Sequence, residues 1–240
     1  MNLKTSLDRI KIFADGASLP QMLESARDAR IRGFTTNPTL MRKAGVSDYK
    51  AFALEALAAI TDKPISFEVF ADDFSEMRRQ AQDIATWGKN VYVKIPITTT
   101  RRESAVPLVA ELSHAGVKLN VTAICTLEQV RATADALRGG APSVVSVFAG
   151  RIADTGRDPM PIMREALAAC RAAGTNVELL WASPREVLNI VHAIEVRCDI
   201  ITVTPDLLKK LELFGKDLGE FSLETVQMFH RDAASAGYVL

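Results

Sequence analysis

Short apolar runs alternate with longer amphipathic runs along the whole chain. The short runs are rich in Val, Ile and Phe, which is typical of buried strands. The predicted strands are Ile10–Asp15, Gly33–Asn37, Ile65–Phe70, Val91–Pro96, Lys118–Ile124, Val144–Gly150, Asn176–Ala182 and Ile200–Thr204. The predicted helices are Leu19–Ile31, Asp48–Ile60, Phe74–Trp87, Arg102–Ala115, Leu127–Leu137, Pro159–Ala173, Pro184–Val196 and Pro205–Leu213. Because a (β/α)8 barrel is built from eight such units, the pattern predicts an α/β fold, a TIM barrel.

An open, doubly wound sheet is the alternative arrangement of these units. That fold would require a Gly-rich GxGxxG loop after the first strand, whereas the chain has Asp15-Gly16-Ala17-Ser18 there. We therefore predict one barrel domain over residues 1–240, with the barrel at about 10–215 and a C-terminal helical extension at about 216–240. The extension contains an amphipathic segment, Leu223–Ala234. Either it packs on its own barrel or it docks on a neighbouring subunit.

Composition narrows the function classes. The chain has 29 basic and 29 acidic side chains, so no overall charge favours nucleic acid or a membrane surface as a partner. The segment Met1–Arg9 lacks the apolar core of a signal peptide, and no apolar run is long enough to span a bilayer. The three cysteines, Cys125, Cys170 and Cys198, are widely spaced and form no CxxC pair. We expect a cytoplasmic protein, with Cys125 as a minor candidate for a catalytic thiol.

Polar residues gather where the predicted strands end. In a barrel these carboxyl ends carry the active site, and strand residues two apart face the same side. The polar residues at these ends are Asp15, Thr35, Thr36, Asn37, Ser66, Glu68, Lys94, Asn120, Thr122, Ser146, Arg151, Ser183, Arg185, Thr202 and Thr204. A hydrogen-bonded plug would explain the Ser, Thr and Asn. It would need no amine, and the acids and the lysine are better explained by acid–base chemistry.

Lys94 lies near the end of the apolar strand Val91–Pro96. Burial of an unpaired ammonium is costly, and desolvation favours the neutral amine that attacks a carbonyl to form a Schiff base. The alternative is a strand-end lysine that reaches solvent or forms a salt bridge. The three histidines all fall in predicted helices, at His114, His192 and His230, so we expect neither histidine catalysis nor a metal site.

Five motifs in these positions resemble the transaldolase family, including its short branch similar to fructose-6-phosphate aldolase. They are Phe34-Thr35-Thr36-Asn37-Pro38, Val93-Lys94-Ile95-Pro96, Asn120-Val121-Thr122, Phe148-Ala149-Gly150-Arg151 with Asp154, and Ala182-Ser183-Pro184-Arg185. The resemblance covers nearly the whole chain. It implies a class I aldolase mechanism without metal or organic cofactor, small-molecule sugar phosphates as partners, and a homo-oligomer formed through the C-terminal helix.

The resemblance also implies residue roles. Lys94 forms the Schiff base, Asp15 moves the proton of the C4 hydroxyl, and Glu68 serves imine formation through a water beside Thr122. Substrate binding is assigned to Thr36, Asn37, Asn120, Ser146 and Phe148, with Arg151, Ser183 and Arg185 on the phosphate. For the two arginines the alternative is a surface ion pair, for instance Arg151 with Asp154.

Two positions distinguish transfer from release of free dihydroxyacetone. The aldolase branch has a tyrosine and a glutamine where this chain has Phe148 and Glu68, which favours transfer and therefore a transaldolase. The resemblance makes the pentose phosphate pathway the expected setting. The short chain is more like the aldolase branch, so the aldolase is the alternative function. A non-catalytic barrel that binds sugar phosphates is a remote alternative. Departures at Gly16 and Pro184, together with Cys125 and Trp181 near the mouth, leave the acceptor sugar open.

Overall fold

Eight strands close into a barrel in the computed structural model, which describes residues 7–238. They are β1 (Lys11–Asp15), β2 (Ile31–Thr35), β3 (Ile65–Glu68), β4 (Val91–Pro96), β5 (Leu119–Ile124), β6 (Ser143–Val147), β7 (Val177–Trp181) and β8 (Ile200–Val203). Each strand pairs in parallel with the next, and β8 closes on β1. The predicted barrel is confirmed and the open doubly wound sheet is wrong. The N-terminal residues 1–6, part of the segment considered for a signal peptide, lie outside the described residues.

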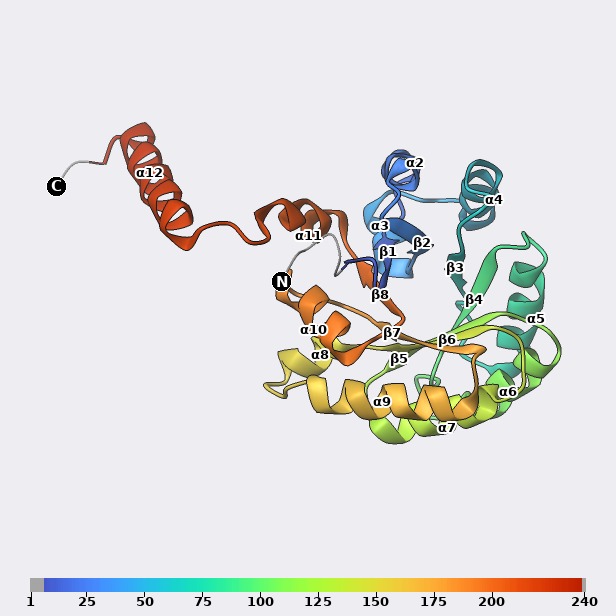
Figure 1. The fold of residues 1–240 in the computed structure, drawn as a ribbon. Coiled ribbons are helices and arrows are strands. Elements are labelled where there is room, and N and C mark those ends of the chain that lie inside the picture. Colours follow the sequence, from blue (N-terminus) through green and yellow to red (C-terminus); the bar gives the residue numbers. More distant parts are fainter. Residues whose placement is uncertain (1–6, 239–240) are drawn as a thin grey trace.

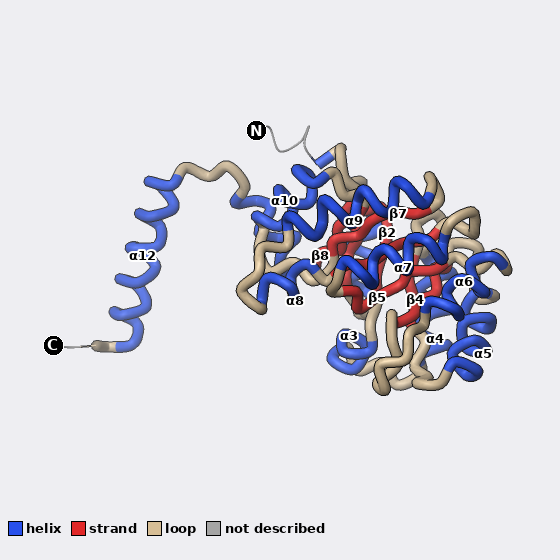
Figure 2. Tube along the Cα trace, turned by 90° about the horizontal axis from the view of Figure 1, so that it is seen from below, coloured by secondary structure: helices blue, strands red, loops and turns tan. Residues whose placement is uncertain are grey.

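Helices surround the strands (Figures 1 and 2). They are α2 (Leu19–Arg27), α3 (Pro38–Lys43), α4 (Tyr49–Ala59), α5 (Phe74–Ala85), α6 (Val106–His114), α7 (Leu127–Leu137), α8 (Ala149–Asp154), α9 (Met160–Ala173), α10 (Leu188–Val196), α11 (Pro205–Lys209), the 3-10 helix η1 (Lys210–Leu213) and α12 (Leu218–Ala236). Side-chain caps fix several starts: Asp48 and Asp73 accept backbone N–H groups of α4 and α5, and Thr126 forms a capping box with Gln129.

The core has two parts. A large apolar layer fills the space between strands and helices, and a smaller cluster inside the barrel contains Phe13, Val144, Leu180 and Ile200. Phe13 lies directly against Gly33, where an added Cβ would come within 2.6 Å of the ring. Strands such as β6 and β8 are buried along their whole length, as expected for a parallel sheet covered by helices.

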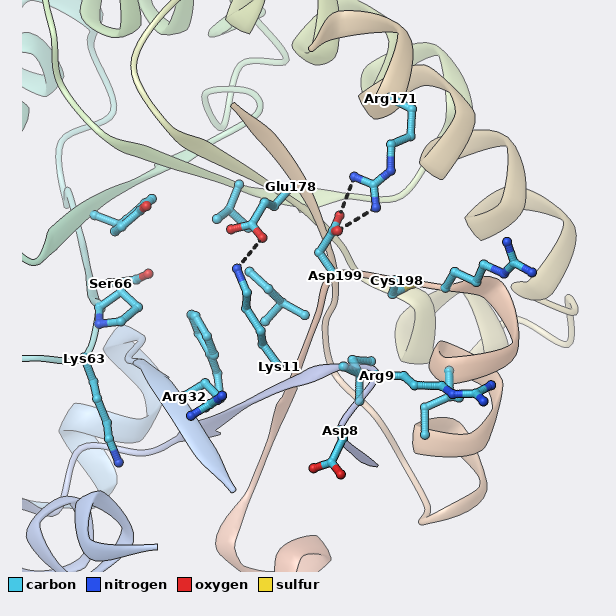
Figure 3. A pocket seen from close by; sticks show the side chains of 18 of the residues that line it. Asp8, Arg9, Lys11, Arg32, Lys63, Ser66, Arg171, Glu178, Cys198 and Asp199 are labelled. Atoms are coloured by element: carbon cyan, nitrogen blue, oxygen red, sulfur yellow. Dashed lines mark hydrogen bonds and ion pairs between the residues drawn. The ribbon is translucent and has the colours of Figure 1, made fainter. Parts of the chain in front are cut away.

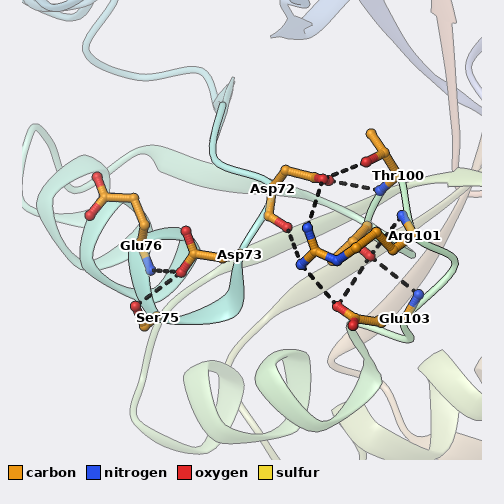
Figure 4. A network of polar contacts seen from close by, with 8 residues as sticks. Asp72, Asp73, Ser75, Glu76, Thr100, Arg101 and Glu103 are labelled. Carbon is orange, nitrogen blue, oxygen red and sulfur yellow. Dashed lines mark hydrogen bonds and ion pairs between the residues drawn. The ribbon is translucent and has the colours of Figure 1, made fainter.

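Two predicted helices begin later than expected because loops precede them. The helix predicted from Arg102 starts at Val106, since Thr98 and Ser104 pair as an antiparallel bridge and Arg102 has a left-handed backbone with φ of 66°. Hydrogen bonds from Thr100 to Asp72, and the Arg101–Glu103 ion pair, hold this loop (Figure 4).

The helix predicted from Pro184 starts at Leu188. In the preceding turn, the side-chain oxygen of Asn189 accepts the backbone N–H groups of Arg185 and Glu186, which replaces the first helical turn.

Other elements also differ from the predicted ones. Ile31, predicted as the end of a helix, begins β2, because α2 ends at Arg27 in a turn where Asp28 accepts the Arg30 N–H. The strand predicted to Gly150 ends at Val147, and the short helix α8 follows. The short helix α3 was also not predicted, although Asn37 as N-cap and Pro38 as first residue are a recognisable start signal.

The C-terminal helix α12 projects away from the barrel (Figures 1 and 2). It spans Leu218–Ala236, longer than the predicted Leu223–Ala234, and none of its residues is buried. Packing on its own barrel, one of the two sequence-based options, is therefore wrong for this structure. None of the helices within residues 7–238 combines the length and apolar composition needed to cross a membrane.

Candidate active site

Lys94 is buried inside the barrel, with 7% of its surface exposed. Its Nζ donates a hydrogen bond to the carbonyl oxygen of Thr36 at 2.7 Å and lies 3.1 Å from Glu68 Oε2. Lys94 is buried, so the alternative of a solvent-reaching lysine is wrong, but it does form the salt bridge that the same alternative allowed, with Glu68. Its catalytic role stays a prediction. A buried ammonium held this way is stable only because both partners are present.

Strand register brings the three central residues together. Glu68 of β3 is the partner of Lys94 in β4, and Lys94 is the partner of Asn120 in β5. Residues paired across parallel strands face the same side of the sheet. Glu68, Lys94 and Asn120 therefore form a row across three adjacent strands.

Asp15 ends β1 and lines the same cavity as Lys94. The hydroxyl of Thr35 donates to Asp15 Oδ1 at 2.8 Å, and Thr35 in turn contacts the hydroxyl of Thr202. Burial raises the pKa of the Asp15 carboxyl, an effect that the Lys94 ammonium and the Thr35 hydrogen bond partly offset. A carboxyl with a raised pKa is suited to accept and return a proton near neutral pH.

A second hydrogen-bonded group fixes Asn120. Its amide nitrogen donates to Ser66 Oγ at 3.0 Å, and its amide oxygen accepts from Ser146 Oγ at 2.6 Å. All three residues are buried. Thr36 lies behind them: its hydroxyl donates to the carbonyl of Ser66, and Thr36 does not line the cavity. Thr36 contacts the site through its backbone carbonyl oxygen, which accepts a hydrogen bond from Lys94 Nζ.

The cavity has a volume of about 390 Å³. Ten of the predicted site residues line it: Asp15, Asn37, Glu68, Lys94, Asn120, Thr122, Ser146, Phe148, Arg151 and Ser183. Asn37 also caps α3, because its side-chain oxygen accepts the Leu40 N–H at 3.0 Å. A bulge in β5, where Ala123 has φ of 62°, places Ala123 as well as Thr122 on the cavity wall.

One end of the cavity carries Arg151. Its guanidinium lies 5.7 Å from the centre of the Phe148 ring, a cation–π contact that orients it. Arg185, predicted beside it, does not line the cavity and pairs with Asp154 through Nε at 3.0 Å and Nη2 at 2.5 Å. Asp154, considered from the sequence as an ion-pair partner of Arg151, thus pairs with Arg185. The role of Arg185 on phosphate stays a prediction.

Gly150 holds α8 against the loop after β7. A Cβ at this position would come within 1.6 Å of the Ser183 carbonyl oxygen, so only glycine permits this approach. Ser183 itself has a left-handed backbone, with φ of 58°. The contact brings Arg151 and Ser183 to the same end of the cavity.

A larger cavity, of about 960 Å³, lies at the opposite end of the barrel (Figure 3). Charged side chains at its rim pair with one another: Lys11 Nζ lies 2.6 Å from Glu178, and Arg171 holds Asp199 at 2.6 Å. Lys94 does not line it, and the amino-terminal end of such a barrel normally serves stability. The smaller cavity is therefore the candidate active site.

Three strand-end residues that received no role from the sequence also lie around the cavity: Thr35 and Thr202 beside Asp15, and Ser66 beside Asn120. Their positions at strand ends, two residues from other polar side chains, were the available signal. The three histidines lie in α6, α10 and α12, as predicted. Burial raises the pKa of Cys125, which disfavours a thiolate there. Within residues 7–238, no three His, Cys, Asp or Glu side chains gather as a metal site would require.

The fold and this cavity define a (β/α)8 barrel with a buried lysine and two carboxyl groups in one cavity. A family model described as transaldolase/fructose-6-phosphate aldolase matches residues 12–238. The chain belongs to this family. The resemblance predicted from its strand-end motifs is therefore confirmed.

Curated relatives carry the name "Probable transaldolase". One from Dehalococcoides mccartyi is 34% identical over 202 residues, covering 84% of this chain and 90% of the relative. Another, from Methanococcus maripaludis, is 35% identical over 202 residues, covering 84% and 89%. A third, from Roseiflexus castenholzii, is 35% identical over 193 residues, covering 80% and 85%. Family and names support an enzyme of the aldolase or transaldolase type.

Solved structures share the fold at low sequence identity. Dihydrodipicolinate synthase from Rhodopseudomonas palustris aligns with a TM-score of 0.53 and 15% identity, covering 81% of this chain and 69% of the other. The alpha subunit of tryptophan synthase from Campylobacter jejuni aligns with a TM-score of 0.53 and 13% identity, covering 81% and 86%. These likenesses show the barrel alone.

Proposed function

We propose that this protein is a transaldolase, which moves a dihydroxyacetone unit from a ketose phosphate to an aldose phosphate through a Schiff base on Lys94. The observation that carries the proposal is the position of Lys94 in the cavity. Its buried amine lies 3.1 Å from the Glu68 carboxylate, and the Asp15 carboxyl lines the same cavity. An amine that shares a cavity with two carboxyl groups has both the nucleophile and the proton carriers that imine chemistry needs.

In the first step, Lys94 passes a proton to Glu68, and the neutral Nζ attacks the C2 carbonyl of the ketose and forms a carbinolamine. Loss of the C2 oxygen as water then gives the imine, so protons must move from nitrogen to oxygen. Glu68 is in position to carry them, because its carboxylate contacts Nζ. Thr122, buried on the same wall, supplies a hydroxyl for the water that the later hydrolysis consumes.

In the second step, Asp15 accepts the proton of the C4 hydroxyl. The C3–C4 bond breaks, its electron pair passes into the iminium as an enamine, and an aldehyde leaves. The raised pKa of Asp15 allows it to hold this proton until an acceptor aldehyde enters and bond formation reverses the step. Asn120, fixed by Ser66 and Ser146, supports binding of the donor hydroxyls.

Arg151 is the proposed phosphate ligand. A guanidinium binds phosphate through two parallel N–H groups, and the Phe148 ring restricts its motion. Ser183, at the same end of the cavity, contributes its hydroxyl. Arg185 would join them only after release from Asp154, which already holds it bidentately.

Transfer is favoured over release of free dihydroxyacetone by Phe148 and Glu68, both of which line the cavity. An aldolase of the same mechanism is the alternative function. Product analysis separates the two: with a ketose phosphate and no added aldehyde, a transaldolase releases dihydroxyacetone slowly. Rapid accumulation of dihydroxyacetone would instead support the aldolase.

Borohydride trapping tests the central proposal. The protein is incubated with fructose 6-phosphate, reduced, and mapped by peptide mass spectrometry, with Lys94→Ala as control. We expect a dihydroxyacetone-sized adduct on Lys94 that the variant lacks. An intact hexose adduct would leave the cleavage step unsupported. Absence of any adduct with several ketose phosphates, despite their binding, would favour a non-catalytic sugar-phosphate-binding barrel.

We also propose that α12 docks on a second copy of this chain. It carries large exposed side chains without cover from its own barrel, among them Leu218 at 80%, Val226 at 61% and Phe229 at 62% exposure. A contiguous apolar face of this kind marks a contact surface. The cytoplasmic location and the pentose phosphate pathway remain predictions.

A further inference from the structure

Tyr49, the first residue of α4, makes two hydrogen bonds with the backbone of Glu68. Its hydroxyl donates to the Glu68 carbonyl oxygen at 3.0 Å and accepts from the Glu68 N–H at 2.7 Å. Tyr49 lies outside the lysine cavity. It therefore touches the site only through the backbone of one of its acids.

The strand ladder explains why Glu68 needs this partner. β2 and β3 pair only at Phe34–Ile65 and Thr35–Ser66, followed by a last hydrogen bond from Thr36 N–H to the Ser66 carbonyl. In a parallel ladder, residues two apart direct their backbone groups to the same side, so Glu68 also faces β2. Beyond Thr36 the chain turns into α3. Two residues after Thr36 comes Pro38, whose backbone nitrogen carries no hydrogen and cannot donate to Glu68. The Tyr49 hydroxyl takes the place of the missing strand.

The ring of Tyr49 is held from three sides. Phe67 lies edge-on with ring centres 6.2 Å apart, Phe70 at 4.4 Å and Trp87 at 5.8 Å. The helix that carries Tyr49 is fixed in turn by its Asp48 cap. Burial also raises the pKa of the phenol, so the hydroxyl keeps its proton and stays a donor at any working pH.

We propose that Tyr49 is a positioning residue that sets the Glu68 carboxylate against Lys94 through the Glu68 backbone. The inference rests on the proposed Schiff-base function. Glu68 is the last residue of β3, and only its β4 side is held by the strand ladder. Without the Tyr49 hydroxyl, two part-buried backbone groups of Glu68 lose their partner and the end of β3 is free to shift. Displacement of a catalytic group by about 1 Å is enough to slow a reaction ~100-fold.

The test compares Tyr49→Phe with Tyr92→Phe. Both substitutions remove one phenolic hydroxyl and keep the ring. Tyr92 lies in β4, the strand of Lys94, but lines the cavity at the opposite end of the barrel. We expect Tyr49→Phe to lower kcat about 10- to 100-fold with KM changed much less, and to slow imine formation measured by single-turnover borohydride trapping. The pH profile of kcat should also shift, and Tyr92→Phe should match the parent in all three.

Two results would overturn the inference. One is Tyr49→Phe with the kcat, trapping rate and pH profile of the parent. The other is a loss of activity that follows a loss of folded protein in thermal unfolding, with an unchanged trapping rate per folded molecule. Failure of the proposed function itself is distinguishable, because the parent protein would then give no Lys94 adduct.

Discussion

Replacement of Asp15 by asparagine should make the protein more stable and nearly inactive. The carboxyl is buried beside Thr35, and burial raises its pKa above the ordinary value of 3.8. Asparagine keeps an oxygen that accepts from Thr35 and carries no charge. The variant therefore mimics the protonated carboxyl and avoids the cost of burying the charge.

The size of the effect follows from linkage. Each unit by which folding raises a carboxyl pKa costs the folded state about 1.4 kcal/mol at a pH above both values. The cost is absent below pH 3.8, where the carboxyl is protonated in both the folded and the unfolded chain. It grows as the pH rises towards the pKa that the Asp15 carboxyl has in the folded protein. Asp15→Asn removes it, so we expect the variant to be the more stable protein at pH 7, by about 1.4 kcal/mol for each unit by which folding raises the pKa. For a chain of this size each kcal/mol raises Tm by about 2–4 °C.

Urea unfolding of the parent and of Asp15→Asn from pH 4 to 8 measures this gain in stability. In an activity assay, the turnover of Asp15→Asn should fall about 10²- to 10⁴-fold, because the proton carrier is lost. Asp72→Asn is the matched control. Hydrogen bonds from Thr100 hold the pKa of this exposed carboxyl below its usual range, so its removal should give no gain at neutral pH. A parent as stable as Asp15→Asn at pH 7 would refute the reasoning, as would a difference that shrinks with rising pH.

Three further predictions concern the phosphate end, a packing contact and assembly. Arg151→Lys should raise KM for a phosphorylated ketose about tenfold, because lysine loses the bidentate contact, whereas Arg78→Lys on the surface should not. Gly150→Ala should destabilise by about 3 kcal/mol in urea unfolding, because the new Cβ would lie 1.6 Å from the Ser183 carbonyl oxygen. Phe229→Glu should reduce the mass measured by light scattering to that of one chain, and a parent already monomeric would contradict the role given to α12.

The sequence was sufficient to predict the barrel and most of the cavity wall, and the reason is periodicity. Strand residues two apart face the same side, so polar residues at strand ends had to converge once the strands closed in order. Asp15, Glu68 and Lys94 could be placed from this rule without knowledge of any distance. Helix starts were less accurate, because the turn at Asn189 and the loop at Arg102 depend on bonds that local pattern does not encode.

What the pattern could not predict were contacts between distant segments. Arg151 and Arg185 follow adjacent strands, and nothing in the sequence shows that Asp154 pairs with Arg185. Tyr49 lies within the predicted helix Asp48–Ile60, yet it bonds to Glu68, 19 residues further along the chain. Such partners depend on how far each strand pairs with its neighbour, which is decided by the packing of the whole barrel.

The register of β3, β4 and β5 places Lys94 inside the barrel beside Glu68. Because side chains alternate between the two faces of a strand, a shift of one residue would turn Lys94 out of the barrel and leave Glu68 without its cation. The buried ammonium opposes such a shift itself, since it is stable only beside Glu68 and the Thr36 carbonyl. Asp15 has the opposite effect, because its buried carboxyl costs stability at neutral pH. The Lys94–Glu68 pair therefore opposes a shift of register, whereas the buried carboxyl of Asp15 costs stability and is accounted for by the proton transfer proposed for it.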